Sequence, residues 1–233
     1  MGIIWELGFF AVITWISYHC SMKVVKGNKT LELTAEKFAD LAKGFKKIVV
    51  DLGTGDGRFV YKNALQDPYT LYIGIDPAEK QMESFSKKAL KKRLGNVLFV
   101  PGSFELYPKD LEGLASHLYV TLPWGSLLKA AAESSLDTVK KFANMLHHGS
   151  ILTLIFGYDL ELEPSQTSRL DLEPISFQKV GQEIVPKFVE GGFELLESFE
   201  TSNAEINKLE STWGKRISTT KERVYFNLVL RYL

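Results

Sequence analysis

The chain has 233 residues, 45% of them hydrophobic and 24% charged, which fits a folded globular protein and excludes a mainly disordered one. Its single cysteine, Cys20, excludes an internal disulfide framework and a zinc site built from cysteines. Twenty-eight basic residues balance 28 acidic ones, so the protein as a whole does not attract phosphate. Any contact with nucleic acid must therefore come from a local basic patch.

The amino terminus differs from the rest of the chain. Residues 7–22 are mostly apolar and contain no Asp, Glu, Lys or Arg. This run is shorter than the about 20 residues of a spanning helix, and Glu6 stands where a signal peptide carries a basic residue. We predict that residues 1–21 are a dispensable extension, with Met22 as an alternative start, and that residues 22–233 form a single domain. A membrane anchor is the alternative.

The first elements are a hairpin and a helix. Residues 23–33 alternate between polar and apolar and break at Gly27-Asn28, a pair typical of a two-residue hairpin turn. Thr34 is a candidate N-cap for a helix that continues to about Lys43. Residues 47–52 then form a continuous apolar run, typical of a strand that is buried on both faces.

Strands and helices alternate in the central part of the chain. Strand-like runs recur at residues 71–75, 96–100, 117–122 and 150–156. Helix-like stretches lie between them, at residues 57–65, 78–93 and 127–147. This alternation predicts βαβ units and a parallel sheet.

The pattern changes after Tyr158. Residues 157–177 are polar and predict a long connection, and a helix is expected over 178–190. Two strand-like runs, 193–201 and 224–232, are joined by a long segment and end the chain. We therefore predict an α/β fold with a seven-stranded, mostly parallel sheet that ends in one antiparallel strand.

A glycine-rich loop follows the first buried strand directly. It reads Asp51-Leu-Gly53-Thr-Gly55-Asp-Gly57-Arg58 and opens a helix, so a ligand can approach its backbone closely. A dinucleotide fingerprint would need glycine at position 58, and a P-loop would need a Gly-Lys-Ser/Thr ending. The acid-preceded glycines instead suit a ligand with an amino-acid head, whose amino group would lie near Asp51.

Two further loops complete this pattern. Asp76 ends the next strand, about 20 residues on, where a carboxylate can accept hydrogen bonds from both ribose hydroxyls of an adenosine. Phe104 and Glu105 follow the third strand and could hold an adenine ring. The three loops together predict an S-adenosylmethionine site. The alternative is three ordinary βα turns with capping acids.

The loop after the fourth strand reads Thr121-Leu122-Pro123-Trp124-Gly125-Ser126 and offers no strong side-chain acceptor for an exocyclic amine. A ring nitrogen such as adenine N1 already has a free lone pair and needs only a stacked, aligned position. The face of Trp124 can stack on such a base and stabilise the cation that forms. Trp213, in the polar segment between the last two strands, is the candidate second face. A core position for Trp213 is the alternative.

A basic cluster occupies the helix after Asp76. Residues 84–96 contain no acid but carry Lys87, Lys88, Lys91, Lys92 and Arg93. Spacings of one, four and five place the lysines on one helical face. In a neutral chain this cluster indicates a phosphate track, with a merely solvated face as the alternative.

These features resemble the aminoglycoside-resistance 16S ribosomal RNA methyltransferases that modify N1 of adenine 1408, the KamB- and NpmA-like enzymes. The likeness runs from about Met22 to Tyr232. It is carried by the motifs Lys26-Gly-Asn-Lys-Thr30, Val50-Asp-Leu-Gly-Thr-Gly-Asp-Gly-Arg58, Tyr72-Ile-Gly-Ile-Asp-Pro77, Lys87-Lys88, Pro123-Trp124-Gly125 and Trp213-Gly-Lys-Arg216.

The resemblance implies a class I, Rossmann-like methyltransferase fold and a cytoplasmic enzyme, expected to be a monomer without a metal, that acts on the 30S subunit. It implies cofactor contacts at Asp51, Gly53, Gly55, Asp76, Phe104, Glu105, Thr121, Leu122, Pro123, Trp124, Gly125, Ser126, Ser211, Thr212 and Trp213. Trp124, Trp213 and Pro123 would form the catalytic pocket, with the two tryptophans clasping a flipped adenine. The rRNA would be bound by Lys87, Lys88, Lys91, Lys92, Arg216, Lys221 and Arg223.

The sequence departs from the family pattern at three positions. Leu122 stands where an aromatic residue is expected, Lys221 replaces an expected arginine, and Arg169 matches the basic residue of the linker between the fifth and sixth strands only loosely. His147-His148 is expected at a helix end, with no metal role. Two other functions stay open: an S-adenosylmethionine-dependent methyltransferase acting on a tRNA purine or a small molecule, and a non-catalytic RNA-binding module.

Overall fold

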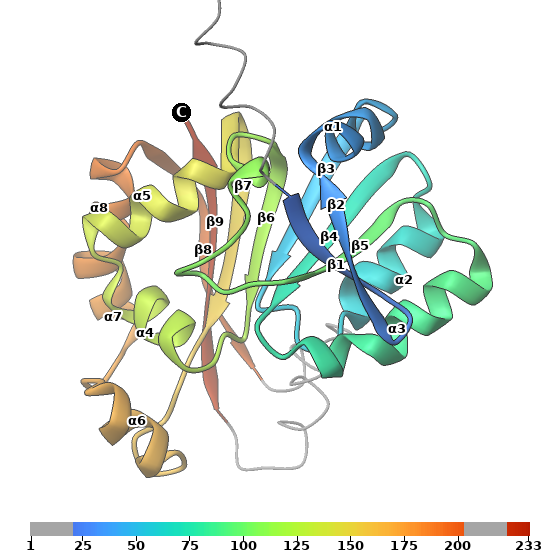
Figure 1. Ribbon diagram of the computed structural model, residues 1–233. Helices are drawn as coiled ribbons and strands as arrows, with labels where there is room; N and C mark the ends of the chain where they lie inside the picture. The colour runs from blue at the N-terminus through green and yellow to red at the C-terminus, as the bar shows by residue number, and fades with distance from the viewer. Residues whose placement is uncertain (1–20, 203–222) are drawn as a thin grey trace, which may run out of the picture.

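A computed structural model describes residues 21–202 and 223–233. Its centre is a seven-stranded sheet of order β5-β4-β3-β6-β7-β9-β8 (Figure 1), in which β9 pairs antiparallel with both β7 and β8. This confirms the predicted mostly parallel sheet with one antiparallel strand. The strands are β3 (Lys47–Leu52), β4 (Thr70–Asp76), β5 (Val97–Pro101), β6 (Ala115–Thr121), β7 (Leu146–Phe156), β8 (Phe193–Ser202) and β9 (Val224–Tyr232).

Helices cover both faces of the sheet and enclose two apolar clusters. On one face α2 (Arg58–Gln66) and α3 (Glu79–Lys92) bury Val60 and Phe85 against Phe99. On the other face α4 (Ser126–Glu133), α5 (Leu136–Met145) and α8 (Val185–Glu190) bury a larger cluster around Phe142 and Phe156. A buried phenylalanine of this kind stabilises the fold by about 1.5–3 kcal/mol through removal of apolar surface from water.

The predicted hairpin and first helix are confirmed. Strands β1 (Ser21–Lys26) and β2 (Lys29–Thr34) pair antiparallel around a turn in which Gly27 has φ 71°. Thr34 caps α1 (Ala35–Lys43), because its side chain accepts a hydrogen bond from the Lys37 amide. The hairpin lies against α3 and the β5 edge of the sheet (Figure 1).

The single helix expected over 127–147 is wrong. The chain leaves α4 at Ser134, which adopts a left-handed conformation, and Ser135 then caps α5. Two consecutive serines thus end one helix and start the next, since serine side chains compete for backbone hydrogen bonds at such positions. His147 and His148 consequently lie in β7 rather than at a helix end, and β7 begins earlier than expected.

The region after β7 is more structured than predicted. The expected connection contains α6 (Pro164–Leu170), where proline occupies the first turn, a position that needs no amide hydrogen. The expected helix over 178–190 is confirmed, and consists of α7 (Phe177–Lys179), a π-helical turn η2 (Val180–Ile184) and α8. A short 3₁₀ turn, η1 (Lys109–Leu111), precedes β6.

The described residues contain no helix long and apolar enough to cross a membrane. The predicted extension falls almost wholly on residues 1–20, outside the described residues. The second tryptophan motif also lies outside them, within residues 203–222.

Candidate active site

The loops that follow β3, β4, β5 and β6 surround one open cleft of about 990 Å³. Parallel pairing of β3 with β4 and β6, and of β4 with β5, brings the carboxyl ends of these strands to one edge of the sheet. The cleft is therefore built at the position where open α/β sheets bind ligands. Its lining includes Gly53, Gly55, Asp76, Phe104, Glu105, Leu122, Trp124, Gly125 and Ser126, all predicted site residues.

The glycine loop is held in a shape that side chains would prevent. Gly53 has φ 82°, and a Cβ atom there would lie 2.9 Å from Leu127 Cδ2. Gly57 has φ 77°, and its Cβ would lie 2.5 Å from the Phe99 ring. The Gly53 amide donates to the Ile75 carbonyl at 2.8 Å, which anchors the loop to the end of β4. Glycine is required at both positions because the backbone has positive φ and a Cβ atom would clash with Leu127 or with Phe99.

Asp76 joins the glycine loop to the start of α3. One carboxylate oxygen accepts from the Gly55 amide and the other from the Ala78 amide, each at 2.8 Å. Burial raises the pKa of Asp76, and these two hydrogen bonds partly offset that rise. Each carboxylate oxygen carries a second lone pair, so Asp76 can still accept ribose hydroxyls from the cleft.

Asp51 lies beneath the loop rather than on the cleft surface. Its side chain is buried and accepts a hydrogen bond from the Thr54 hydroxyl at 2.6 Å. Burial raises the pKa of Asp51 to about 7; the Thr54 bond opposes the rise, and the nearby Asp76 and Asp56 add to it. Asp56 pairs with the Arg58 guanidinium at 3.0 Å, so Asp76 and the ionised fraction of Asp51 supply the negative charge that favours a cationic ligand. Contact between Asp51 and a ligand amino group stays a prediction.

The loop after β5 connects the cofactor side to the Trp124 loop. Phe104 is mostly buried, packs on Phe142 with ring centroids 4.8 Å apart, and lies under the Lys141 ammonium group. Burial raises the pKa of Glu105, but hydrogen bonds from Ser126 and Ser103 outweigh it, and the net shift is downward. Glu105 is therefore an ionised acceptor that ties this loop to the first residue of α4.

The Trp124 loop has an unusual backbone. Leu122 has φ 51°, although it is neither glycine nor asparagine and precedes a proline, which disfavours helical conformations. Its side chain is buried, and its amide donates to the Ile155 carbonyl at 2.7 Å. Trp124, two residues later, is 42% exposed and lines the cleft. Leu122 thus anchors a strained bend that projects the indole, and strain of this kind is concentrated at functional sites.

Two predicted residues of this loop lie elsewhere. Pro123 lines a small neighbouring cavity of about 20 Å³ together with Trp124, Glu163, Arg223 and Tyr225. Thr121 is not among the residues that line the cleft or this cavity.

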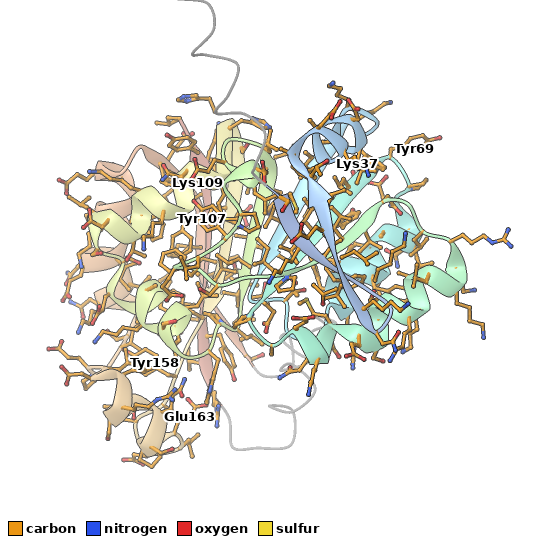
Figure 2. The ribbon with its side chains drawn as sticks, in the orientation of Figure 1. Lys37, Tyr69, Tyr107, Lys109, Tyr158 and Glu163 are labelled. Atoms are coloured by element: carbon orange, nitrogen blue, oxygen red, sulfur yellow. The ribbon has the colours of Figure 1, made fainter. Side chains whose placement is uncertain are left out.

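Arg223 forms an ion pair that sequence reasoning missed. Its guanidinium bonds the carboxylate of Glu163, and both side chains are about 87% buried, with exposed fractions of 13% and 12%. Glu163 carried no signal in the sequence because the partners are 60 positions apart. Figure 2 shows Glu163 near the lower edge of the sheet, beside α6 and below α4. Phosphate binding by Arg223 stays a prediction, and Glu163 would compete for the guanidinium.

The basic cluster lies on an exposed face of α3. Lys87 pairs with Glu83 at 3.0 Å, and the Lys88 ammonium lies 4.1 Å from the Phe85 ring centroid. Lys91 and Lys92 are exposed. The remaining predicted site residues lie outside the described residues: Ser211, Thr212, Trp213, Arg216 and Lys221. Arg169, left open by the sequence, bonds the Gln166 side chain at 3.1 Å. No group of three potential metal ligands occurs in residues 21–202 or 223–233.

The family model of the 16S rRNA (adenine(1408)-N(1))-methyltransferases, named NpmA, matches residues 23–230. The chain belongs to this family. An Escherichia coli enzyme of the same description is 29% identical over 89% of this chain and 97% of its own. A 30S ribosomal A1408 methyltransferase from an uncultured bacterium is 33% identical, with a TM-score of 0.71 over 91% of this chain and all of its own.

A mutant 16S rRNA (adenine(1408)-N(1))-methyltransferase from Catenulisporales acidiphilia, crystallised with cosubstrate SAM, shares the fold. It is 24% identical, with a TM-score of 0.80 over 91% of this chain and 97% of its own. Family membership confirms the resemblance found in the sequence, the fold class, and an enzyme that uses S-adenosylmethionine as methyl donor. Family membership therefore excludes the alternative of a non-catalytic RNA-binding module.

Proposed function

We propose that this protein transfers a methyl group from S-adenosylmethionine to N1 of adenine 1408 in the 16S rRNA of the 30S subunit, and so confers aminoglycoside resistance. The observation that carries this proposal is the position of Trp124. Its indole is 42% exposed on the rim of an acid-lined cleft, in a loop that offers only the hydroxyls of Thr121 and Ser126 as side-chain acceptors. That arrangement suits a ring nitrogen, not an exocyclic amine.

The residues of the cleft fit the methyl donor. When bound, S-adenosylmethionine supplies a methyl group carried on a positively charged sulfur. Asp76 would accept the ribose hydroxyls, and the backbone around Gly53 and Gly55 would lie against the amino-acid portion. The negative charge of Asp76 and of ionised Asp51 favours a ligand with cationic groups. The cleft volume of about 990 Å³ leaves room for a base beside the cofactor.

Trp124 would hold the flipped adenine by stacking. The N1 lone pair is free in neutral adenine, so no general base is needed before attack, and the chain supplies position rather than proton transfer. The indole face also stabilises the positive charge that the base gains, by cation–π attraction. Trp213, outside the described residues, is proposed as the opposite face, and Pro123 as part of the pocket wall.

Docking would precede base flipping. Lys87, Lys88, Lys91 and Lys92 on α3 would contact rRNA phosphates, and so would Arg216, Lys221 and Arg223, which follow the second tryptophan in the sequence. Because the 30S subunit is the substrate, we propose that the enzyme acts in the cytoplasm. We also propose that it is a monomer. Its single domain would span residues 22–233, with residues 1–21 as a dispensable extension. Mass spectrometry of the native amino terminus tests the last point, since a membrane-bound protein beginning at Met1 would overturn it.

One assay separates this function from related ones. Purified protein starting at Met22 is incubated with S-adenosylmethionine and either 30S subunits, free 16S rRNA or tRNA, and modified sites are mapped by primer extension. N1 methylation blocks base pairing, so reverse transcriptase should stop at adenine 1408 with 30S subunits. Methylation of tRNA, or of a small molecule, without that stop would favour the alternative methyltransferase. Survival of expressing bacteria on aminoglycosides, including apramycin, tests resistance.

A further inference from the structure

The turn of the β1–β2 hairpin is flanked by two exposed lysines. The strand register places Lys26 directly opposite Lys29, on either side of Gly27-Asn28, and both lysines are exposed. Like charges directly opposite each other on paired strands destabilise the pair. Neither lysine forms an ion pair with another residue in the described part of the chain. A negatively charged partner at this end of the hairpin would relieve the repulsion between Lys26 and Lys29.

A buried serine fixes this turn to α3. The Ser86 hydroxyl accepts a hydrogen bond from the Gly27 amide and donates one to the Val25 carbonyl, each at 2.8 Å. Ser86 is 2% exposed, so water does not compete for these bonds. The Thr30 hydroxyl also donates to Glu79 in the first turn of α3. The turn is thus held at two places along the basic helix.

The turn and the lysines of α3 form one surface. A Cβ atom on Gly27 would lie 3.1 Å from Leu90 Cδ1 and 3.9 Å from Lys87 Cγ, so the hairpin backbone touches the stretch of α3 that carries the cluster. Figure 1 shows the tip of the hairpin beside α3, toward the edge where the parallel strands end. We call this the hairpin–helix surface and define it by Lys26, Lys29, Lys87, Lys88, Lys91 and Lys92.

The acids near this surface leave most of its charge uncompensated. Glu79 accepts the Thr30 hydroxyl, Glu83 pairs with Lys87, and Glu32 lies opposite Lys23 in the hairpin. We propose that Lys26 and Lys29 contact the phosphate backbone of 16S rRNA, so that the hairpin–helix surface as a whole, not α3 alone, docks the enzyme on the 30S subunit. This inference rests on the proposed function, and it assigns the hairpin a role in RNA binding.

The experiment compares two double charge reversals in 30S binding. Lys26→Glu with Lys29→Glu should lower 30S affinity at least about tenfold near 0.1 M salt. The slope of the logarithm of the binding constant against the logarithm of the salt concentration should become shallower by about one to two units, because each lost phosphate contact removes close to one unit. The matched control is Lys37→Glu with Lys140→Glu, which makes the same change in net charge on α1 and α5. Lys37 lies at the opposite edge of the sheet (Figure 2), and the control should change the affinity little.

Two more variants separate charge from structure. Lys26→Arg with Lys29→Arg keeps the charge and should bind 30S subunits like wild type. Ser86→Ala removes the two bonds that fix the turn, without changing charge, and should weaken 30S binding several-fold. S-adenosylmethionine affinity should be unchanged in every variant, which shows that the domain is folded.

Unchanged 30S affinity and salt slope in the hairpin reversal would overturn the inference, and so would an equal loss in the control. If the hairpin reversal lost binding to anionic phospholipid vesicles but kept its 30S binding, the inference would be overturned in favour of a membrane surface. If wild type methylates 30S subunits in the same preparation, the proposed function stands even when the hairpin inference fails. If wild type neither binds nor methylates them, the proposed function itself has failed.

Discussion

On the cofactor side of the molecule, Asp51 is buried and Asp76 half-buried, and they are held by hydrogen bonds from Thr54 and two backbone amides. On the docking side, Lys26, Lys29 and Lys91 are exposed and have no ion-pair partner among the described residues. The cofactor site is preorganised by burial, so its groups gain strength from a low dielectric. The docking surface is solvated, so each contact is weak alone, additive and sensitive to salt.

The largest expected effect falls on the docking side. Lys87→Glu with Lys88→Glu should abolish 30S binding, because it converts two phosphate contacts into two repulsions on the central part of the hairpin–helix surface. Affinity for S-adenosylmethionine should stay at the wild-type value, since neither lysine lines the cleft. Equilibrium binding to 30S subunits and calorimetry with the cofactor test both halves. Retained 30S binding would return α3 to an ordinary solvated helix.

The next effect falls on the cofactor side. Asp76→Ala should weaken S-adenosylmethionine binding by about 1.5–3 kcal/mol, the usual contribution of hydrogen bonds to a charged group. It also leaves the Gly55 and Ala78 amides without their acceptor, so the loop should loosen. Binding to 30S subunits should hardly change. Asp40→Ala, an exposed acid on α1, is the control; equal cofactor affinity in Asp76→Ala and wild type would mean that the ribose lies elsewhere.

On both sides, the sequence predicts local features better than contacts between residues that are far apart in the chain. The glycine loop, Asp76 and the Trp124 loop were identified because each depends on residues within a few positions of a strand end. The Glu163–Arg223 pair and the Ser86 link to the hairpin were not, because their partners are about 60 positions apart and only tertiary packing joins them. The break at Ser134 was missed because the apolar pattern continues through two helices that two serines separate.

The smallest expected effect is a dependence on pH. Burial raises the pKa of Asp51 to about 7, so its carboxyl is half protonated there in the free enzyme. A cationic amino group beside it would favour the ionised form, and binding would then release a proton. Affinity for S-adenosylmethionine should therefore improve as pH rises through about 7. Calorimetry from pH 6 to 8 (about one unit on each side) should show this slope in wild type and a flatter profile in Asp51→Asn.

Folding stability gives an independent check on the same group. The folded pKa of about 7 lies above the ordinary aspartate pKa of 3.8, so the folded chain holds the proton more tightly. The contribution of Asp51 to stability is therefore present at low pH and is lost as pH rises from about 4 to about 7. Asp51→Asn should lack this fall in thermal scans. Parallel curves for wild type and Asp51→Asn in both assays would contradict the raised pKa.

The central claim is that Trp124 acts on the base and not on the fold, and one set of measurements on Trp124→Ala and Trp124→Phe tests it. Loss of one stacking face should cost about 1–3 kcal/mol at the methylation step, and misalignment of N1 adds to this. The account predicts a strong loss of 30S methylation in Trp124→Ala and a smaller loss in Trp124→Phe, which keeps an aromatic face. It also predicts 30S affinity and melting temperature close to wild type. A melting temperature lower by several degrees, together with weakened binding, would show instead that Trp124 is a structural residue.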